Sequence, residues 1–235
     1  MDKRIYNTLK LKEPTVKGYS KDKKYLAVTA EGIKFFLRIA HISRYENHKL
    51  LFSLMKQISE FGIPMCFPLE FGICDEGVYS IQSWIDGERL TVELPALTHA
   101  EQYAVGLQSG DILRKIHNIR SPDAQENWTI LFNKKVDENI MKYHCCETKI
   151  DGYEHFVDYI DNNRRLLENR PQCFLHGDYH TENMMIANGE LTIIDFERYD
   201  FGDPWNDFAR VVFSARKSPH FATGQLNGYF CGEPP

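Results

Sequence analysis

Two short segments near the end of the chain hold most of the residues that could do chemistry: HGDYHTEN (176–183) and DFE (195–197). Asp178 and Asn183 are five residues apart, and Asp195 ends an apolar stretch that a tight turn can fold back towards them. A carboxylate can accept the proton of an attacking hydroxyl, while an amide oxygen and a second carboxylate are ligands of the kind that Mg²⁺ prefers. These residue types therefore predict the transfer of a phosphoryl group.

The same residues and their neighbours allow simpler interpretations. Asp and Asn are common in turns, although turn formation does not account for three of them in this order between apolar strands. His176 and His180 have the spacing of a zinc-binding pair on a helix, but Gly177 and Asp178 interrupt a helix at that point. The protein-kinase signature H-R-D-x-x-x-x-N, followed by D-F-G, has the same order of groups, with Gly177 here in place of Arg and Glu197 in place of the last Gly. Phosphoryl transfer is therefore the favoured interpretation.

The elements that must position these residues begin with a strand-rich front part. Apolar alternation predicts strands at 25–30, 33–40, 68–74 and 78–84, and helical spacing predicts a helix at 43–60. In the second of these strands, Lys34, Phe36 and Arg38 lie on the same face. The first 85 residues thus predict a small antiparallel sheet with one helix.

From residue 86 onward the pattern is mainly helical. Thr98 and Glu101 form a T-x-x-E capping box at the start of a helix that runs to about residue 119. Asn188 and Gly189 join two short apolar runs as a tight hairpin. Further helices are expected at 133–146, at 152–168 and after the Asp203-Pro204 pair.

The composition of the 235-residue chain is that of a globular protein, with 43% hydrophobic and 26% charged residues and a formal charge of −5. Residues 1–85 carry a net charge of +4 and residues 86–235 a net charge of −9. Without a polybasic run, nucleic acid is not an expected partner, and the short apolar runs exclude a membrane-spanning segment. Six cysteines without a CxxC pair, and an N-terminus without an apolar signal core, favour a reduced, cytoplasmic protein.

In these motifs the sequence resembles the aminoglycoside phosphotransferase and choline kinase family of small-molecule kinases. The family pattern H-G-D-x-H-x-x-N is complete in 176–183, and IIDFE (193–197) and GDPWNDFAR (202–210) continue it. GYSKDKKY, FFLRIA and YSIQSWIDGE resemble its nucleotide loop, phosphate-binding strand and hinge. The resemblance implies an α+β, protein-kinase-like bilobal fold, with an antiparallel sheet and one helix in an N-lobe over 1–85, a hinge at 82–87 and a mainly helical C-lobe over 86–235.

The resemblance also implies roles for the residues of the C-lobe. Asp178 is expected to be the catalytic base in a catalytic loop at 176–183, with Asn183 and Asp195 holding Mg²⁺. His176 is expected to support this loop by hydrogen bonding rather than by chemistry. Asp207 resembles a buried acid that braces the loop.

The nucleotide-binding residues that the resemblance implies are Ser20, Arg38, Glu46, Ser83 and Ile85. Ser20 and its neighbours would cover the β-phosphate. Arg38 would clamp phosphate oxygens with its planar fork, and Lys34 on the same face is the alternative cation. Glu46 would be the helix partner of that cation, although an acid near a helix start is also favoured by the helix dipole. The backbone around Ser83 and Ile85 would bind the adenine.

The implied activity is the ATP- (or GTP-) and Mg²⁺-dependent transfer of the γ-phosphate to a hydroxyl of a small molecule. An aminoglycoside-like antibiotic is the first expectation, because the acidic C-lobe favours a cation; choline, ethanolamine, another amino alcohol or a sugar-like metabolite is the alternative. A nucleotide-binding scaffold without turnover is the alternative of another class. The sequence does not indicate an oligomeric state, and the resemblance leads us to expect that the chain lacks the last C-terminal helices of the family.

Overall fold

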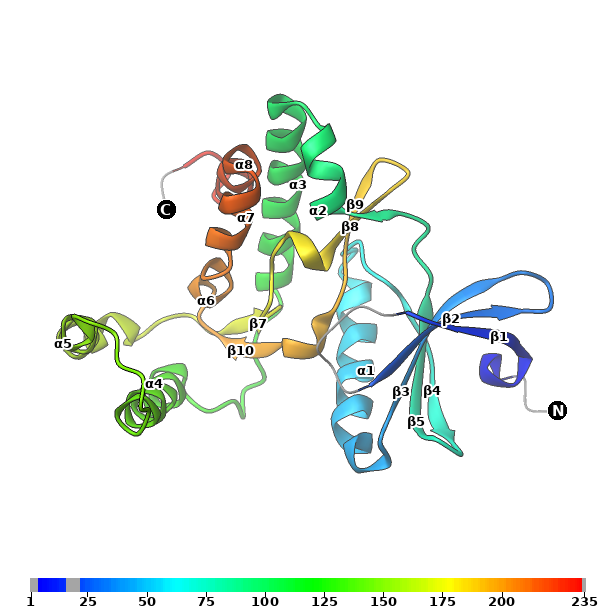
Figure 1. The fold of residues 1–235 in the computed structure, drawn as a ribbon, viewed down its shortest axis with the longest axis horizontal. Coiled ribbons are helices and arrows are strands. Elements are labelled where there is room, and N and C mark those ends of the chain that lie inside the picture. The colour runs from blue at the N-terminus through cyan, green and yellow to red at the C-terminus, as the bar shows by residue number, and fades with distance from the viewer. Residues whose placement is uncertain (1–3, 16–21, 234–235) are drawn as a thin grey trace.

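The front part of the molecule is a five-stranded antiparallel sheet in the order β1-β2-β3-β5-β4, with helix α1 packed against it (Figure 1). The computed structural model describes residues 4–15 and 22–233. The elements of this part are β1 (Leu9–Pro14), β2 (Lys23–Thr29), β3 (Lys34–Ala40), α1 (Tyr45–Glu60), β4 (Pro68–Cys74) and β5 (Gly77–Ser83). Ser20, the residue expected to cover the β-phosphate, lies outside the described residues.

The sheet has a small core of its own, formed by side chains that alternate along its strands. Leu37, Ile39 and Ile81 are buried in this core. Arg38, between Leu37 and Ile39, points to the opposite face, where it is also buried, with 5% of its surface exposed. The two predicted hairpins, β2–β3 and β4–β5, are confirmed. Strand β1 was not predicted: its apolar alternation is limited to Leu9 and Leu11, and its residues after Leu9 are all exposed.

Helix α1 presents one buried stripe to the rest of the molecule. The stripe consists of His48, Phe52, Met55 and Ile58, which are spaced three or four residues apart. Met55 and Ile58 belong to a large core that also contains residues of the helical part, so the helix connects the two parts of the molecule. Glu46, in the first turn, lies outside the stripe and is exposed.

The back part of the molecule is mainly helical, as predicted. Its helices are α2 (Leu90–Glu93), α3 (His99–His117), α4 (Trp128–His144), α5 (Tyr153–Asn163), α6 (Trp205–Phe208), α7 (Val211–Lys217) and α8 (Pro219–Tyr229). Its short strands are β6 (Glu88–Arg89), β7 (Cys173–Leu175), β8 (Met184–Ala187), β9 (Glu190–Ile193) and β10 (Asp200–Gly202). The capping box of Thr98 and Glu101 is confirmed. Helix α4 begins earlier than predicted because the Asn127 side chain caps it.

The β8–β9 hairpin returns the chain to the front part of the molecule. Asn188 and Gly189 have φ values of +53° and +79°, as a type I′ turn requires, so the predicted hairpin is confirmed. The backbone N–H of Ile193 donates to Pro64 O at 2.8 Å. This bond ties the end of β9 to the segment after α1, and Asp195 therefore lies where the two parts meet.

Helices α3 and α8 pack backbone to backbone. Gly106 and Gly110 of α3 face Gly224 and Gly228 of α8, and a Cβ on any of the four would come within 2.1–2.2 Å of a backbone oxygen of the other helix. No side chain larger than hydrogen fits at these positions. The glycines therefore set the position of α8 against α3.

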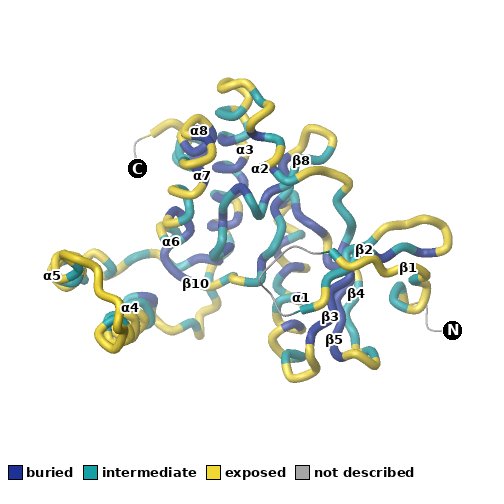
Figure 2. The backbone as a smooth tube through the Cα atoms, in the orientation of Figure 1, coloured by how far each residue is buried: buried dark blue, intermediate teal, exposed yellow. Residues whose placement is uncertain are grey.

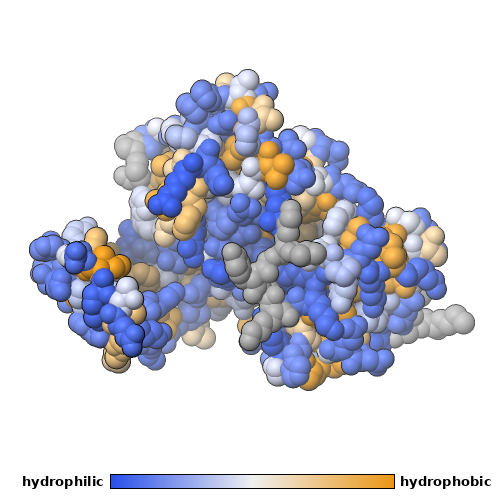
Figure 3. Space-filling view, viewed as in Figure 1, coloured by the Kyte–Doolittle hydropathy of each residue, from blue (hydrophilic) through white to orange (hydrophobic). Residues whose placement is uncertain are grey.

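Helices α4 and α5 project from the remaining helices at one end of the molecule (Figure 1). The two helices are mostly teal and yellow in Figure 2, and Trp128 of α4 is their one buried residue. Apolar side chains gather on this projection (Figure 3), where Met141, Phe156 and Tyr159 are about two-thirds exposed. None of the helices in the described part of the chain combines the length and the apolar character that crossing a bilayer requires.

Candidate active site

A single buried carboxylate holds the start of the segment 176–183, which we call the HGD loop. Asp207 of α6 accepts hydrogen bonds from the backbone N–H of His176 at 2.8 Å, from that of Gly177 at 2.7 Å and from His117 Nε2 at 3.1 Å. Tyr229 of α8 in turn donates its hydroxyl proton to His117 Nδ1 at 2.8 Å. Three hydrogen bonds to a fully buried carboxylate fix the loop strongly. The expectation that Asp207 braces this loop is confirmed.

His176 supports the HGD loop from inside the core. Its Nδ1 accepts the backbone N–H of Asp178 at 3.3 Å, so Nε2 carries the proton and donates it to Ile194 O at 3.1 Å. Burial lowers the pKa of His176, which favours this neutral form. Because both ring nitrogens have partners, His176 is not available to zinc.

Gly177 lies where the HGD loop touches the segment after Asp195. Its φ of +79° is in the left-handed region, and a Cβ would lie 1.8 Å from Arg198 O. Both the backbone conformation and the close approach require glycine. The second residue of the kinase signature, which is arginine in protein kinases, has no room here.

The three residues predicted to carry the chemistry lie together. Asn183 Nδ2 donates to the backbone oxygen of Asp178 at 2.9 Å and to its Oδ2 at 3.2 Å. The backbone oxygen of Asn183 accepts the N–H of Ile194 at 3.0 Å, which places Asp195 beside it. Asp195 has a φ of +66°, an unusual value for a residue other than glycine. Such an outlier at the meeting point of the three residues is typical of a functional site.

The oxygen atoms around Asp195 fit a divalent cation. Asn183 uses its amide nitrogen for Asp178, so its Oδ1 is the atom left for a ligand. Asp195 Oδ1 is buried and has no hydrogen-bond partner among the described residues. The guanidinium of Arg38 is 3.9 Å from this oxygen, beyond hydrogen-bond distance, so a closer cation or donor would stabilise it. Carboxylate and amide oxygens are the ligands that Mg²⁺ prefers.

Arg38 is the buried cation on the sheet side of the site. Its Nη1 is 2.6 Å from Glu197 Oε1, and its Nη2 is 3.9 Å from Asp195 Oδ1. Lys34, the alternative cation, lies at the surface and pairs with Asp86 at 2.6 Å. Lys24, opposite Arg38 in the β2–β3 pairing, has its pKa lowered by burial and by the charge of Arg38. The structure therefore brings Arg38, not Lys34, to Asp195.

The expected pair between Glu46 and Arg38 is not formed, and this part of the prediction needs correction. Among the described residues, the carboxylates within ion-pair distance of Arg38 belong to Asp195 and Glu197. Glu46 is two residues from His48 of the buried stripe, which is a rotation of about 200° around a helix. It therefore faces solvent, and its place in the first turn fits the helix dipole.

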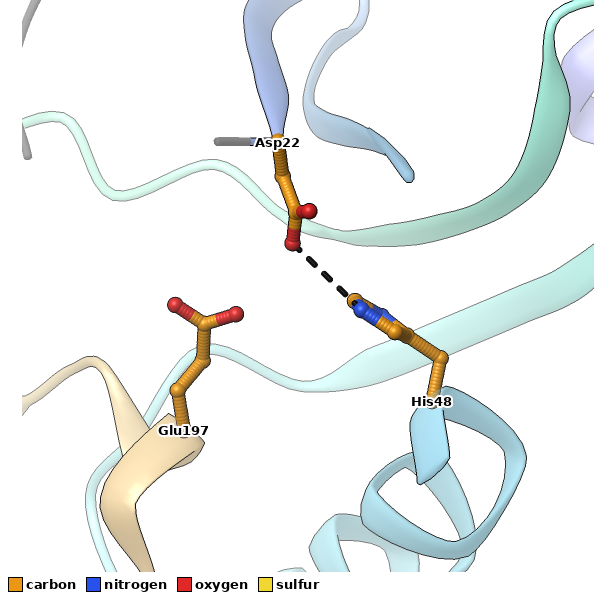
Figure 4. A group of neighbouring side chains, drawn as sticks. All are labelled: Asp22, His48 and Glu197. Atoms are coloured by element: carbon orange, nitrogen blue, oxygen red, sulfur yellow. Dashed lines mark ion pairs between the residues drawn. The ribbon is translucent and has the colours of Figure 1, made fainter. Parts of the chain in front are cut away.

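A buried cluster of Asp22, His48 and Glu197 adjoins Arg38 (Figure 4). One ligand atom of each residue lies within 4.8 Å of the others, and His48 Nε2 is 3.4 Å from Asp22 Oδ2. Burial lowers the pKa of His48. Burial raises the pKa of Glu197, and the charge of Arg38 partly offsets this rise. Because Arg44 pairs with Asp22 and Arg38 with Glu197, the two carboxylates are already compensated. The cluster is thus an ion-pair network around Arg38.

A cavity of about 350 Å³ lies between the sheet and the segment of Asp195. Apolar side chains form most of its wall, and Arg38, Asp195, Ser83 and Ile85 also line it. Ser83 donates its backbone N–H to Phe67 O at 2.9 Å, so its carbonyl oxygen is the group that it can offer to a ligand. An apolar cavity that combines a backbone acceptor, a cation and an acid has the groups to bind a nucleotide.

Three cationic or titratable side chains converge on the carboxylate of Asp178. Arg210 Nε is 3.3 Å from its Oδ1, His180 Nε2 is 3.4 Å from Oδ1, and Arg198 Nε is 3.8 Å from Oδ2. A second cavity, of about 320 Å³, opens beside these arginines. Sequence reasoning gave none of the three a contact with Asp178. Their only signal was position, since each lies within or directly after one of the recognised motifs.

The fold and the arrangement of Asp178, Asn183, Asp195 and Arg38 define a phosphotransferase of the protein-kinase-like class. The sequence model of the family described as "Phosphotransferase enzyme family" matches residues 13–235 of the chain. The chain belongs to this family, and the predicted α+β kinase-like fold and small-molecule kinase class are confirmed. No curated protein sequence matches the chain.

Solved structures show the same fold at low sequence identity. The streptomycin–ATP complex of APH(2″)-IIa is 20% identical with a TM-score of 0.68, covering 98% of this chain and 82% of that one. A choline/ethanolamine kinase family protein from Mesorhizobium loti is 18% identical with a TM-score of 0.66, covering 96% and 71%. The macrolide 2′-phosphotransferase MphH from Brachybacterium faecium is 14% identical with a TM-score of 0.67, covering 97% and 78%. Proteins with different acceptors therefore share this fold.

Proposed function

We propose that the protein transfers the γ-phosphate of ATP or GTP, with Mg²⁺, to a hydroxyl of a small molecule. The observation that carries the proposal is the convergence of Asp178, Asn183 and Asp195, with the buried Arg38 facing Asp195. Mg²⁺, when bound, neutralises charge on the phosphates. Asn183 and Asp195 hold it, and Arg38 binds phosphate oxygens through its fork.

Asp178 is the residue proposed to accept the proton of the attacking hydroxyl. The Asn183 side chain holds its carboxylate, and His176 and Asp207 fix its backbone segment. Positioning of this kind supplies much of the rate acceleration in phosphoryl transfer, because the protein does little covalent chemistry. The backbone of Ser83 and Ile85 is proposed to bind the base of the nucleotide.

The acceptors to test first come from the similar structures. One of them contains streptomycin, and another belongs to the choline/ethanolamine kinase family. We therefore place aminoglycosides first, followed by choline, ethanolamine and sugars. A nucleotide-binding scaffold without turnover is the alternative of another class.

The test has two stages. Thermal-shift measurements with ATP or GTP and Mg²⁺ report nucleotide binding, and a nucleotide-consumption assay over these acceptors reports transfer. Consumption that depends on one acceptor supports the kinase. Nucleotide binding without consumption over the whole acceptor panel supports the scaffold.

The metal role of Asp195 has its own test. We expect Asp195→Ala to abolish most of the Mg²⁺-dependent gain in nucleotide affinity, because a hard oxygen ligand is lost. Calorimetric titration of nucleotide with and without Mg²⁺ measures this gain. Asp75→Ala, at an exposed turn between β4 and β5, is the matched control and should keep it. An unchanged gain in Asp195→Ala would remove Asp195 from this role.

A further inference from the structure

Two guanidinium groups lie against the carboxylate of Asp178, the proposed proton acceptor. Arg210 Nε lies 3.3 Å and Arg198 Nε 3.8 Å from its two oxygens, and Asn183 already donates to Oδ2. Each guanidinium group has more donors than one carboxylate can accept. The two groups can therefore hold a second anionic partner beside Asp178.

These arginines lie outside the nucleotide cavity. That cavity is lined by Arg38 and Asp195, whereas the second cavity is lined by Arg198 and Arg210, and the two share no lining residue in the described part of the chain. Asp178 lies next to the residues of the second cavity, since Gly177 is part of its wall. The arginines thus border both Asp178 and a cavity that is separate from the nucleotide cavity.

The charge of this second cavity is opposite to that of a site for polycations. Arg198, Arg210 and Lys135 line it, and among the described residues of its wall Asp200 is the one acid. The net charge of −9 over residues 86–235 is therefore not concentrated here. Arginine has a planar fork with several donors, of which Asp178 uses only part, and this fork matches a carboxylate or phosphate group.

We propose that the acceptor carries an anionic group, a carboxylate or a phosphate, which Arg210 and Arg198 bind while its hydroxyl faces Asp178. This inference rests on the proposed phosphoryl transfer. In the step, the acceptor oxygen bonds to the γ-phosphorus, the bond to the β-phosphate oxygen breaks, the hydroxyl proton passes to Asp178, and the nucleoside diphosphate leaves. The inference narrows the acceptor class to hydroxy acids and phosphorylated alcohols. It moves the polycationic aminoglycosides, which structural similarity alone placed first, to the end of the order because of like charge.

Two sets of compounds that differ mainly in charge test the proposal. Glycerate, glycerol and 3-amino-1,2-propanediol form the small set, and glucuronate, glucose and glucosamine the larger one, with glycerol 3-phosphate to separate phosphate from carboxylate. Nucleotide consumption measures transfer, and thermal shift with a non-hydrolysable nucleotide and Mg²⁺ measures binding without turnover. We expect the anionic member of a set to be preferred over the neutral one by about tenfold or more.

Two variants, Arg210→Gln and Arg216→Gln, show whether Arg210 is responsible for the preference for anionic compounds. We expect Arg210→Gln to raise the KM for the anionic compound about tenfold and to remove most of the preference over the neutral one. Arg216→Gln makes the same change of charge at an exposed position of α7 outside both cavities, and should leave the preference intact. A merely structural role of Arg210 would lower activity with all compounds equally.

The outcomes separate this inference from the proposed function. Preferred use of the aminated compounds, or an anion preference that Arg210→Gln leaves unchanged, overturns the inference and leaves the kinase in place. Anion binding that Arg210→Gln removes, without consumption of nucleotide, supports the anion site and contradicts the transfer. Neither binding nor consumption of any anionic compound, glycerol 3-phosphate included, overturns the inference.

Discussion

The HGD loop and the network around Arg38 lie on two sides of Asp195 and are stabilised in different ways. The loop is eight consecutive residues, held through backbone N–H groups by one buried acid, Asp207. The network joins ionisable side chains of four separate segments, which contribute Asp22, Arg38, His48 and Glu197. Hydrogen bonds depend on distance and angle, so bonds to the backbone fix the position of the loop. The energy of an ion pair depends mainly on the charges and their separation. We therefore expect the loop to depend on geometry and the Arg38 network to depend on charge.

The largest effect is expected in the loop. Asp178→Asn keeps the shape of the side chain and removes the proton acceptor, so we expect kcat to fall by about 10²–10⁴-fold. Nucleotide affinity should stay within about threefold, because the nucleotide cavity is lined by other residues. Steady-state kinetics and calorimetric titration check the two halves of this prediction. Near-normal turnover would remove Asp178 from its role.

The second-largest effect is expected at Asp207, the buried acid that holds the HGD loop. Asp207→Ala leaves two buried backbone N–H groups without their acceptor, and we expect it to lower the free energy of unfolding by about 3–5 kcal/mol. Asp203→Ala is the comparison, because its carboxylate pairs with the partly exposed Arg170 and caps Trp205, which predicts a loss of about 1–2 kcal/mol. Urea unfolding measures both. Equal losses would contradict the special position of Asp207.

Substitutions of Arg38 and Lys34, the two cations of β3, test the Arg38 network. Arg38→Gln should weaken nucleotide binding by about tenfold or more, because it removes a charged hydrogen-bonding group at the cavity. Arg38→Lys keeps the charge and should recover much of this loss if charge dominates here. Lys34→Gln, at the surface, should leave affinity within about twofold. A larger effect at Lys34 than at Arg38 would reverse the assignment.

The smallest effect is expected at Glu46. Glu46→Gln should change neither nucleotide affinity by more than about twofold nor the free energy of unfolding by more than about 0.5 kcal/mol, because the residue is exposed. Titration and urea unfolding check this. A loss of affinity comparable to that of Arg38→Gln would restore Glu46 as a functional partner.

The same contrast explains what the sequence allowed to be predicted. Some features are marked by motifs whose residues are close together in the chain, so their spacing was informative. These are the HGD loop, the Asn188-Gly189 hairpin and the Thr98 cap. The partner of Arg38 depends on which face of α1 meets the sheet, and that face contains His48 rather than Glu46. The carboxylate that pairs with Arg38 is instead that of Glu197, which lies about 150 residues after Glu46 in the sequence. The spacing of residues in the sequence does not predict a contact between segments this far apart, such as that of Arg38 with Glu197.

The glycine contact between α3 and α8 has a consequence for how the protein acquires its site during synthesis. Residues 176–183 emerge from the ribosome well before Tyr229, yet the hydroxyl of Tyr229 fixes His117, which holds Asp207. That hydroxyl arrives only when α8 has docked along its glycines. The loop therefore obtains its last support late in translation, and a nascent chain that ends before α8 has its phosphotransfer motif but not the complete set of bonds that holds it.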